Sequence, residues 1–96
     1  MSVLGAAVQQ PNEVLDYDID YTEFFDGEAD VIASVATVVE PSGTLNANGS
    51  VASDTVVKLW LQGGADGDEY FVTIRTTTSA GRVKEDELRV RIREIG

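Results

Sequence analysis

The sequence predicts an all-β protein, an immunoglobulin-like antiparallel β-sandwich of six or seven short strands. Three observations support this fold class. Val, Ile and Thr account for 26 of the 96 residues, and such β-branched residues favour strands. Apolar residues alternate with polar ones in several segments, and no segment keeps a helical 3.6-residue period beyond about two turns. Most glycines fall between the apolar runs, where chain reversals are expected. A small barrel is the alternative architecture.

The chain length supports one domain, which we place at residues 13–96. Residues 1–12 are small and polar and end in Gln-Gln-Pro-Asn. We expect them to form a flexible N-terminal arm. The arm could become ordered against a neighbour through Val3, Leu4 and Val8.

The first strand is expected at residues 15–21, where Leu, Tyr and Ile alternate with aspartates. This pattern is typical of a half-buried strand with a row of carboxylates facing outward. Residues 22–27 break the alternation and predict either a helical turn or a tight connection that ends at a glycine. A second strand follows over residues 30–40 and ends before Pro41. Residues 44–54 are more polar and predict a short strand and a turn.

The second half predicts three further strands. Residues 55–62 form one of them, in which we expect Trp60 to fill the core. A glycine-rich turn leads to a strand over residues 69–77, and residues 79–81 make the next reversal. In the last strand, over residues 88–93, Leu, Val and Ile alternate with three arginines.

Composition excludes several classes of function. The chain has no histidine and no cysteine, so it lacks the usual general base near pH 7 and a Cys/His zinc site. Its net charge of −10 argues against binding to nucleic acid. Apolar runs are too short to span a bilayer, and residues 1–8 do not resemble a signal peptide. We therefore expect no enzyme activity, no cofactor and no membrane partner.

The charge excess lies entirely in the first half. Residues 1–57 hold ten acids and no Lys or Arg, whereas residues 58–96 hold seven of each sign. Such a division is consistent with one acidic sheet, or with a face that meets a basic partner.

Two groups of acids could bind a cation, but neither has suitable spacing. Carboxylates along one face of a strand lie about 6.5–7 Å apart, which is too open for one ion, and the acidic turn lacks the EF-hand ligand pattern. We therefore predict no metal site. The acids concerned are Asp16, Asp18 and Asp20 in the strand and Asp66, Asp68 and Glu69 in the turn.

Three aromatic residues, Tyr21, Phe24 and Phe25, are candidates for a protein interface. They lie beside acids at a break in regular structure, where one or two rings are expected to project outward as anchors for a partner. The alternative is that the rings cover one end of the sandwich.

Three arginines, Arg89, Arg91 and Arg93, are the second interface candidate. Their alternate positions place them on one face of the last strand. They could pair with acids across the sheet, such as Glu85, Glu69 or the aspartate row. Alternatively, this basic stripe could attract the acidic sheet of an identical subunit and build a ring.

Most of the chain outside the arm resembles the phage fiber-tail adaptors, immunoglobulin-like subunits of phage tails. The strongest part of the resemblance is a Trp-Leu-Gln-Gly-Gly turn followed by Tyr-Phe-Val-Thr-Ile-Arg-Thr-Thr-Thr-Ser-Ala-Gly-Arg, because together they fix strand, turn, strand and turn in order. The matching segments are residues 20–21, 24–27, 30–34, 57–64, 70–78 and 80–82 and the arginine-rich last strand.

The resemblance implies a non-enzymatic virion component that attaches tail fibres to the tail by protein–protein contacts. Its partners would be tail and fibre proteins, with repeated copies around the tail axis. The chain would be made in the host cytoplasm and located in the virion tail. One alternative is a subunit of the neck or head–tail joint. Another is a receptor- or carbohydrate-binding module that uses Trp60, Tyr17 and Tyr70 as stacking platforms, although the strand period turns both tyrosines inward.

Overall fold

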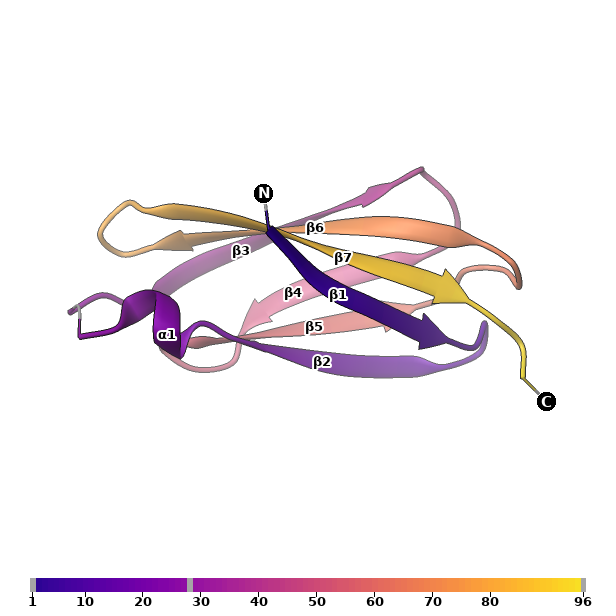
Figure 1. Ribbon diagram of the computed structural model, residues 1–96, viewed down its shortest axis with the longest axis horizontal. Coiled ribbons are helices and arrows are strands. Elements are labelled where there is room, and N and C mark those ends of the chain that lie inside the picture. Colours follow the sequence, from indigo (N-terminus) through magenta and orange to yellow (C-terminus); the bar gives the residue numbers. More distant parts are fainter. Residues whose placement is uncertain (1, 28, 96) are drawn as a thin grey trace.

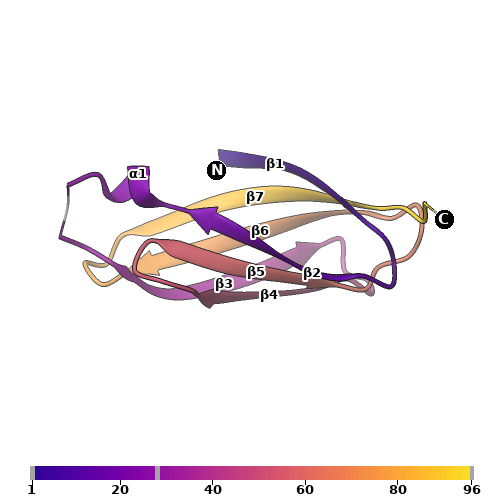
Figure 2. The ribbon, with the colours of Figure 1, turned by 90° about the horizontal axis from the view of Figure 1, so that it is seen from below.

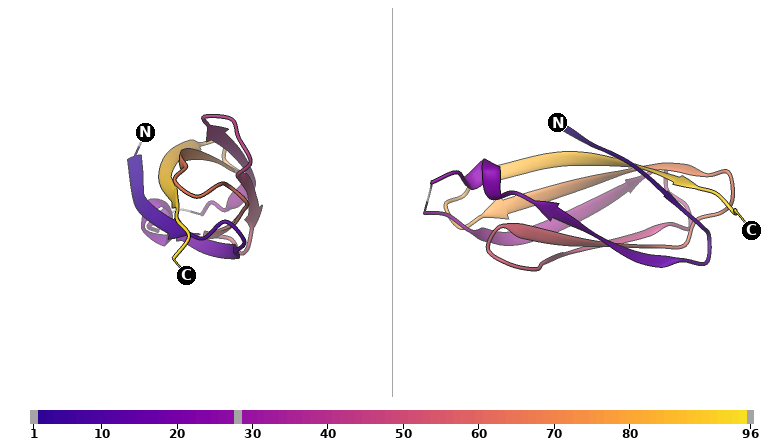
Figure 3. Two further views of the ribbon diagram at one scale, coloured as in Figure 1. Left: turned by 90° about the vertical axis from the view of Figure 1, so that its right-hand side faces the viewer. Right: turned by 60° about the horizontal axis from the view of Figure 1, so that its bottom comes forward.

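A computed structural model describes residues 2–27 and 29–95, so Met1, Glu28 and Gly96 lie outside the described part. Two β-sheets stack face to face in an elongated body of 46 × 22 × 18 Å (Figures 1 and 3). The predicted all-β sandwich is therefore confirmed.

The larger sheet has four strands in the order β1-β7-β6-β3. Their bounds are β1 Ser2–Gln9, β7 Val83–Ile92, β6 Glu69–Thr78 and β3 Ile32–Glu40. The central pairs are antiparallel, but β1 runs parallel to β7. At this edge the sheet differs from the expected purely antiparallel arrangement.

The smaller sheet has three antiparallel strands in the order β2-β5-β4. These are β2 Val14–Asp20, β5 Val56–Gln62 and β4 Asn46–Val51. One helical turn, α1 Thr22–Phe25, follows β2 and lies at one end of the sandwich (Figure 1). Of the two alternatives for residues 22–27, the structure has the helical turn.

The core lies between the two sheets and follows the period of two. In β5 the alternate residues Val57, Leu59 and Leu61 are fully buried, because each faces the opposite sheet. Trp60 points the other way and is 42% exposed, so the prediction that it fills the core is wrong. The other buried apolar residues are Tyr21, Phe25, Ile32, Leu45, Tyr70, Val72, Ile74, Val90 and Ile92.

The N-terminal segment is the second correction, because residues 2–9 form an ordered strand instead of a flexible arm. Its last residue, Gln9, is buried. The Gln9 amide donates to the backbone oxygens of Leu61 and Glu13 at 2.9 and 3.0 Å, and its Oε1 accepts a bond from the Tyr17 hydroxyl at 3.0 Å. A polar side chain whose hydrogen bonds are all made can be buried at little cost, so Gln9 holds the end of β1 in the sandwich.

Candidate interaction surfaces

The first surface is the end of the sandwich that carries α1. Tyr21 and Phe25 are only 5% and 4% exposed there, and they belong to the core. Phe24 is half-buried, with its ring 5.3 Å from that of Phe25 and 6.3 Å from that of Tyr21 in edge-to-face contacts. Only Phe24, of the three predicted anchors, keeps substantial area for a partner.

Tyr21 is held in the core by a polar contact. Its hydroxyl donates a 2.7 Å hydrogen bond to Oδ2 of Asp86, which is itself buried. The Thr76 hydroxyl donates to the Tyr21 oxygen at 3.5 Å. Burial raises the pKa of Tyr21, and the Asp86 carboxylate raises it further. The hydroxyl therefore stays protonated and links the residue between β2 and α1 to β7 of the opposite sheet.

Arg82 covers the two phenylalanines from the turn between β6 and β7. Its guanidinium carbon lies 4.8 Å from the centre of the Phe24 ring and 5.6 Å from that of Phe25. Two of its nitrogens donate to Oδ2 of Asp30 at 3.1 and 3.0 Å. These contacts fix a cation over the aromatic pair.

Asp30 anchors this turn. Burial opposes its ionisation, but hydrogen bonds from Thr78, Arg82 and the backbone amides of Ala80 and Val31 outweigh burial and lower the pKa of Asp30 to about 2. The carboxylate therefore stays charged over the ordinary pH range.

The second surface is the outer face of the four-stranded sheet. Arg89 and Arg91 of β7 both lie exposed on it, and Arg93 is exposed just after the strand ends. Arg91 lies 3.6 Å from Glu69 of β6, so the predicted pairing across the sheet is present for this residue. The guanidinium of Arg89 instead lies 5.7 Å from the centre of the Phe71 ring.

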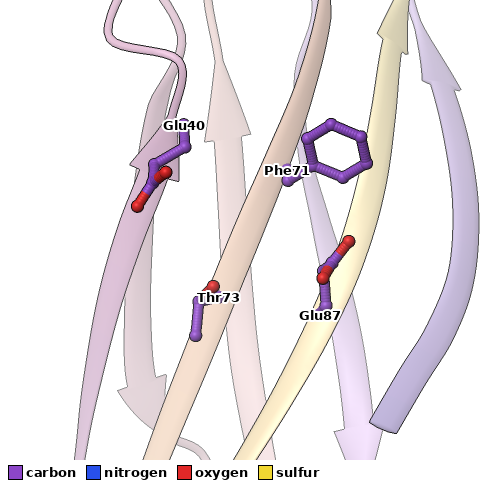
Figure 4. A pocket seen from close by; sticks show the side chains of 4 residues that line it. All are labelled: Glu40, Phe71, Thr73 and Glu87. Atoms are coloured by element: carbon purple, nitrogen blue, oxygen red, sulfur yellow. The ribbon is translucent and has the colours of Figure 1, made fainter. Parts of the chain in front are cut away.

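Phe71 is the central aromatic residue of this face and is 37% exposed. Beside it lies a shallow hollow of about 400 Å³ lined by Glu40, Phe71, Thr73 and Glu87 (Figure 4). In the close-up the ring turns toward β7, away from Glu40, and the small Thr73 leaves space between the two glutamates. The hollow thus offers an aromatic wall and two carboxylates.

The third surface is the outer face of the three-stranded sheet, where the predicted aspartate row lies on β2. Lys58 of β5 donates to Asp16 at 2.8 Å and to Asp18 at 3.1 Å. The hydrogen bond from Lys58 lowers the pKa of Asp16, and both aspartates raise the pKa of Lys58. Asp20 accepts a 2.9 Å bond from the amide of Thr22 at the start of α1. The arginines of β7 do not reach this row, contrary to one of the alternatives above.

The acidic turn before β6 is fixed by hydrogen bonds of its own. Asp68 accepts bonds from the Tyr70 hydroxyl at 2.6 Å and from the amide of Ala65 at 3.2 Å. Asp66 accepts one from the amide of Glu94 at 2.9 Å. Within residues 2–27 and 29–95, no group of acids is arranged to hold a metal ion. None of the described helices is long and apolar enough to cross a membrane.

The sequence did not single out Phe71, Lys58 or the hollow. One signal for Phe71 was present: the period of two sets it opposite Tyr70, so that one of these neighbouring aromatics must face solvent. The hollow had no such signal, because register brings together Glu40 of β3 and Glu87 of β7, which are far apart in the sequence.

Comparison with known proteins gives one family match. The sequence model of the family described as "Podophage GP4 fiber-tail adaptor protein gp77" matches residues 9–91. No curated protein matches the chain.

Proposed function

The chain belongs to the podophage GP4 fiber-tail adaptor protein family, gp77, and we propose that it attaches tail fibres to the phage tail by protein–protein contacts. Membership of this family assigns it to the virion tail as a structural component with tail and fibre partners. The single observation that carries the proposal is the match over residues 9–91, which includes β2 to β6 and all but the last residue of β7. We further propose that the chain is made in the host cytoplasm.

The strand order supports an immunoglobulin-like assignment within the sandwich architecture. The orders β2-β5-β4 and β7-β6-β3 correspond to strands B-E-D and G-F-C of immunoglobulin domains. In this assignment β1 is a first strand that has joined strand G instead of strand B. A domain of this type presents two sheet faces and two ends, which suits a protein that contacts two partners.

We propose that one partner binds the outer face of the four-stranded sheet. Val8 of β1 and Val38 of β3 are more than half exposed on this face, and the arginines of β7 and Phe71 of β6 lie between them. Apolar side chains surrounded by charges are typical of a protein interface with a polar rim. Arg89, Arg91 and Arg93 contribute the basic part, and Phe24 extends the contact to the α1 end. Repeated copies around the tail axis would strengthen such contacts through avidity.

Virions produced without the chain test the attachment role. They are expected to keep their tails and lack fibres, and wild-type chain supplied from a plasmid should restore the fibres, counted by electron microscopy. Particles that carry a normal number of fibres without the chain would refute the proposal.

A matched pair of variants tests the face. Phe71→Ala and Trp60→Ala each remove one exposed aromatic ring, from opposite faces of the sandwich. Phe71→Ala should reduce the number of fibres per particle and Trp60→Ala should not. If Trp60→Ala reduced the number of fibres and Phe71→Ala did not, the partner would bind the outer face of the three-stranded sheet instead.

The exposure of Trp60 keeps a carbohydrate-binding role as a second candidate. In register it stands between Asp16 of β2 and Asn48 of β4, so an aromatic platform has polar side chains on both sides. Tyr70 is buried and Tyr17 half-buried, so neither adds to the platform. A glycan array that gives no binding above that of Trp60→Ala would remove this candidate.

A further inference from the structure

We infer that the free edge of β2 binds an extended segment of another tail or fibre protein, in which Lys or Arg alternates with apolar residues. The inference deepens the proposed adaptor function and rests on it for the identity of the partner. It names a second surface, separate from the outer face of the four-stranded sheet.

The topology leaves β2 open on one side. It pairs with β5, and within residues 2–27 and 29–95 no strand pairs with its other edge. β1 precedes β2 directly in the chain but pairs with β7 of the opposite sheet. The two strands are close at their connecting turn and separate toward the N-terminus of β1 (Figures 2 and 3). The position beside β2 is therefore vacant.

The backbone groups that face this vacancy can be assigned. The amide of Tyr21 donates to the Thr55 oxygen at 2.8 Å, which continues the β2–β5 register by one pair. Backbone direction alternates along an antiparallel strand, so Ile19 and Tyr17 also point their N–H and C=O groups at β5. The groups of Asp16, Asp18 and Asp20 consequently point to the free edge, ready to pair with an added strand.

The side chains around the vacancy define the partner. A groove of about 300 Å³ lies along β2 and is lined by Leu4, Tyr17, Asp18, Ile19, Asp20 and Leu88. Along this groove the inner side of β2 carries Tyr17 and Ile19, which pack against the core, and the outer side carries Asp18 and Asp20. A strand added beside β2 must follow the same alternation. Its inner side chains would be apolar and face Leu4 and Leu88, and its outer side chains would lie beside the aspartates. On the β5 side, Lys58 is shared by Asp16 and Asp18, so the three aspartates keep a net negative charge. Opposite charges at facing positions stabilise a pair of strands, so the outer side chains of the added strand are basic.

A second copy of the chain cannot supply this strand. Its only alternation of basic and apolar residues is at residues 88–93, and β7 up to Ile92 is already paired on both sides. The first 57 residues contain no Lys or Arg. The donor is consequently a different protein.

A peptide titration tests the edge directly. The probe is a synthetic nine-residue peptide in which Arg alternates with Val, and its control has Glu in place of Arg. With the full ¹⁵N-labelled chain, the Arg peptide should shift the amide resonances of β2 and slow hydrogen exchange of the Asp16, Asp18 and Asp20 amides. The Glu peptide should do neither. The inference would be overturned if the Arg peptide left these three amides unprotected, or if both peptides bound equally. If neither peptide bound, the inference would also be wrong, and the aspartates would serve only to prevent edge-to-edge pairing.

Two variants at one position isolate the backbone contribution. Asp18→Asn removes the charge, and Asp18→Pro removes the charge and the outward N–H, which an edge strand tolerates. Affinity for the Arg peptide should fall at least tenfold further for Asp18→Pro than for Asp18→Asn. Leu4→Ser changes the groove from outside β2 and should also weaken binding, so the test does not depend on folding of the proline variant. Equal affinities of all three variants and wild type would contradict strand addition.

Virions separate failure of this inference from failure of the proposed function. If wild type and Asp18→Pro restore fibres equally, the adaptor role stands and the edge is not its contact. If wild type binds the Arg peptide at β2 but particles without the chain keep their fibres, strand addition at β2 is supported and the adaptor role is refuted.

Discussion

Replacement of Tyr21 by Phe tests whether this residue belongs to the core or to an interface. The change keeps the ring and deletes only the hydroxyl, which donates at 2.7 Å to Asp86. Asp86 is 1% exposed and would keep its 3.0 Å bond from Lys84. A hydrogen bond to a charged group contributes about 1.5–3 kcal/mol, so we expect the free energy of unfolding to fall by about 2 kcal/mol. For a domain of this size that corresponds to a decrease in Tm of about 8–16 °C.

Tyr17→Phe is the matched control, because it deletes the same group from a bond to the neutral Gln9 amide at 3.0 Å. A neutral bond contributes about 0.5–1.5 kcal/mol, so the control should lose less stability. Both variants are compared with wild type by urea unfolding followed by circular dichroism. The total stability expected of such a domain, about 5–15 kcal/mol, leaves both folded at 25 °C. A loss for Tyr21→Phe no greater than that for Tyr17→Phe would refute the reasoning from the buried carboxylate.

Two further predictions concern the same end of the sandwich. Phe25→Ala should reduce the free energy of unfolding by about 3–5 kcal/mol, because it leaves a cavity at a buried site. Urea unfolding measures this loss, and an unchanged midpoint would show that Phe25 does not stabilise the core. The pKa of Asp30 is about 2 in the folded chain against about 3.9 when unfolded, so its stabilisation is complete above pH 4 and is lost as pH falls through 2. The unfolding midpoint of wild type should therefore decrease more steeply between pH 4 and 2 than that of Asp30→Asn; parallel curves would contradict this.

The faces of the central strands could be predicted from the sequence. In β6 the alternation set Tyr70, Val72 and Ile74 on one face, and all three are buried. The period of two follows from strand geometry alone, so local sequence is sufficient. The same rule applied to β5 groups Trp60 with Lys58 on the polar face. The prediction that Trp60 fills the core was wrong because it rested on the size of the side chain and not on its position in the alternation.

The candidate surfaces were predicted only in part. Arg89 and Arg91 lie exposed on one face of β7 as expected, because alternation fixes their side. Tyr21 and Phe25 lie in the core because Asp86 and Arg82, more than 50 residues away in the sequence, bond to one ring and cover the other. No local pattern could show that contact.

The sequence by itself determined that the chain forms strands, where the central strands turn, and which residues of each strand share a face, because these properties depend on near neighbours. Only the tertiary structure decided that β1 pairs with β7 and leaves the edge of β2 open. It also decided that Gln9 and Asp86 are buried and that two glutamates meet beside Phe71. Each of these depends on register between distant segments, where the free energy of packing and of buried hydrogen bonds outweighs local preference.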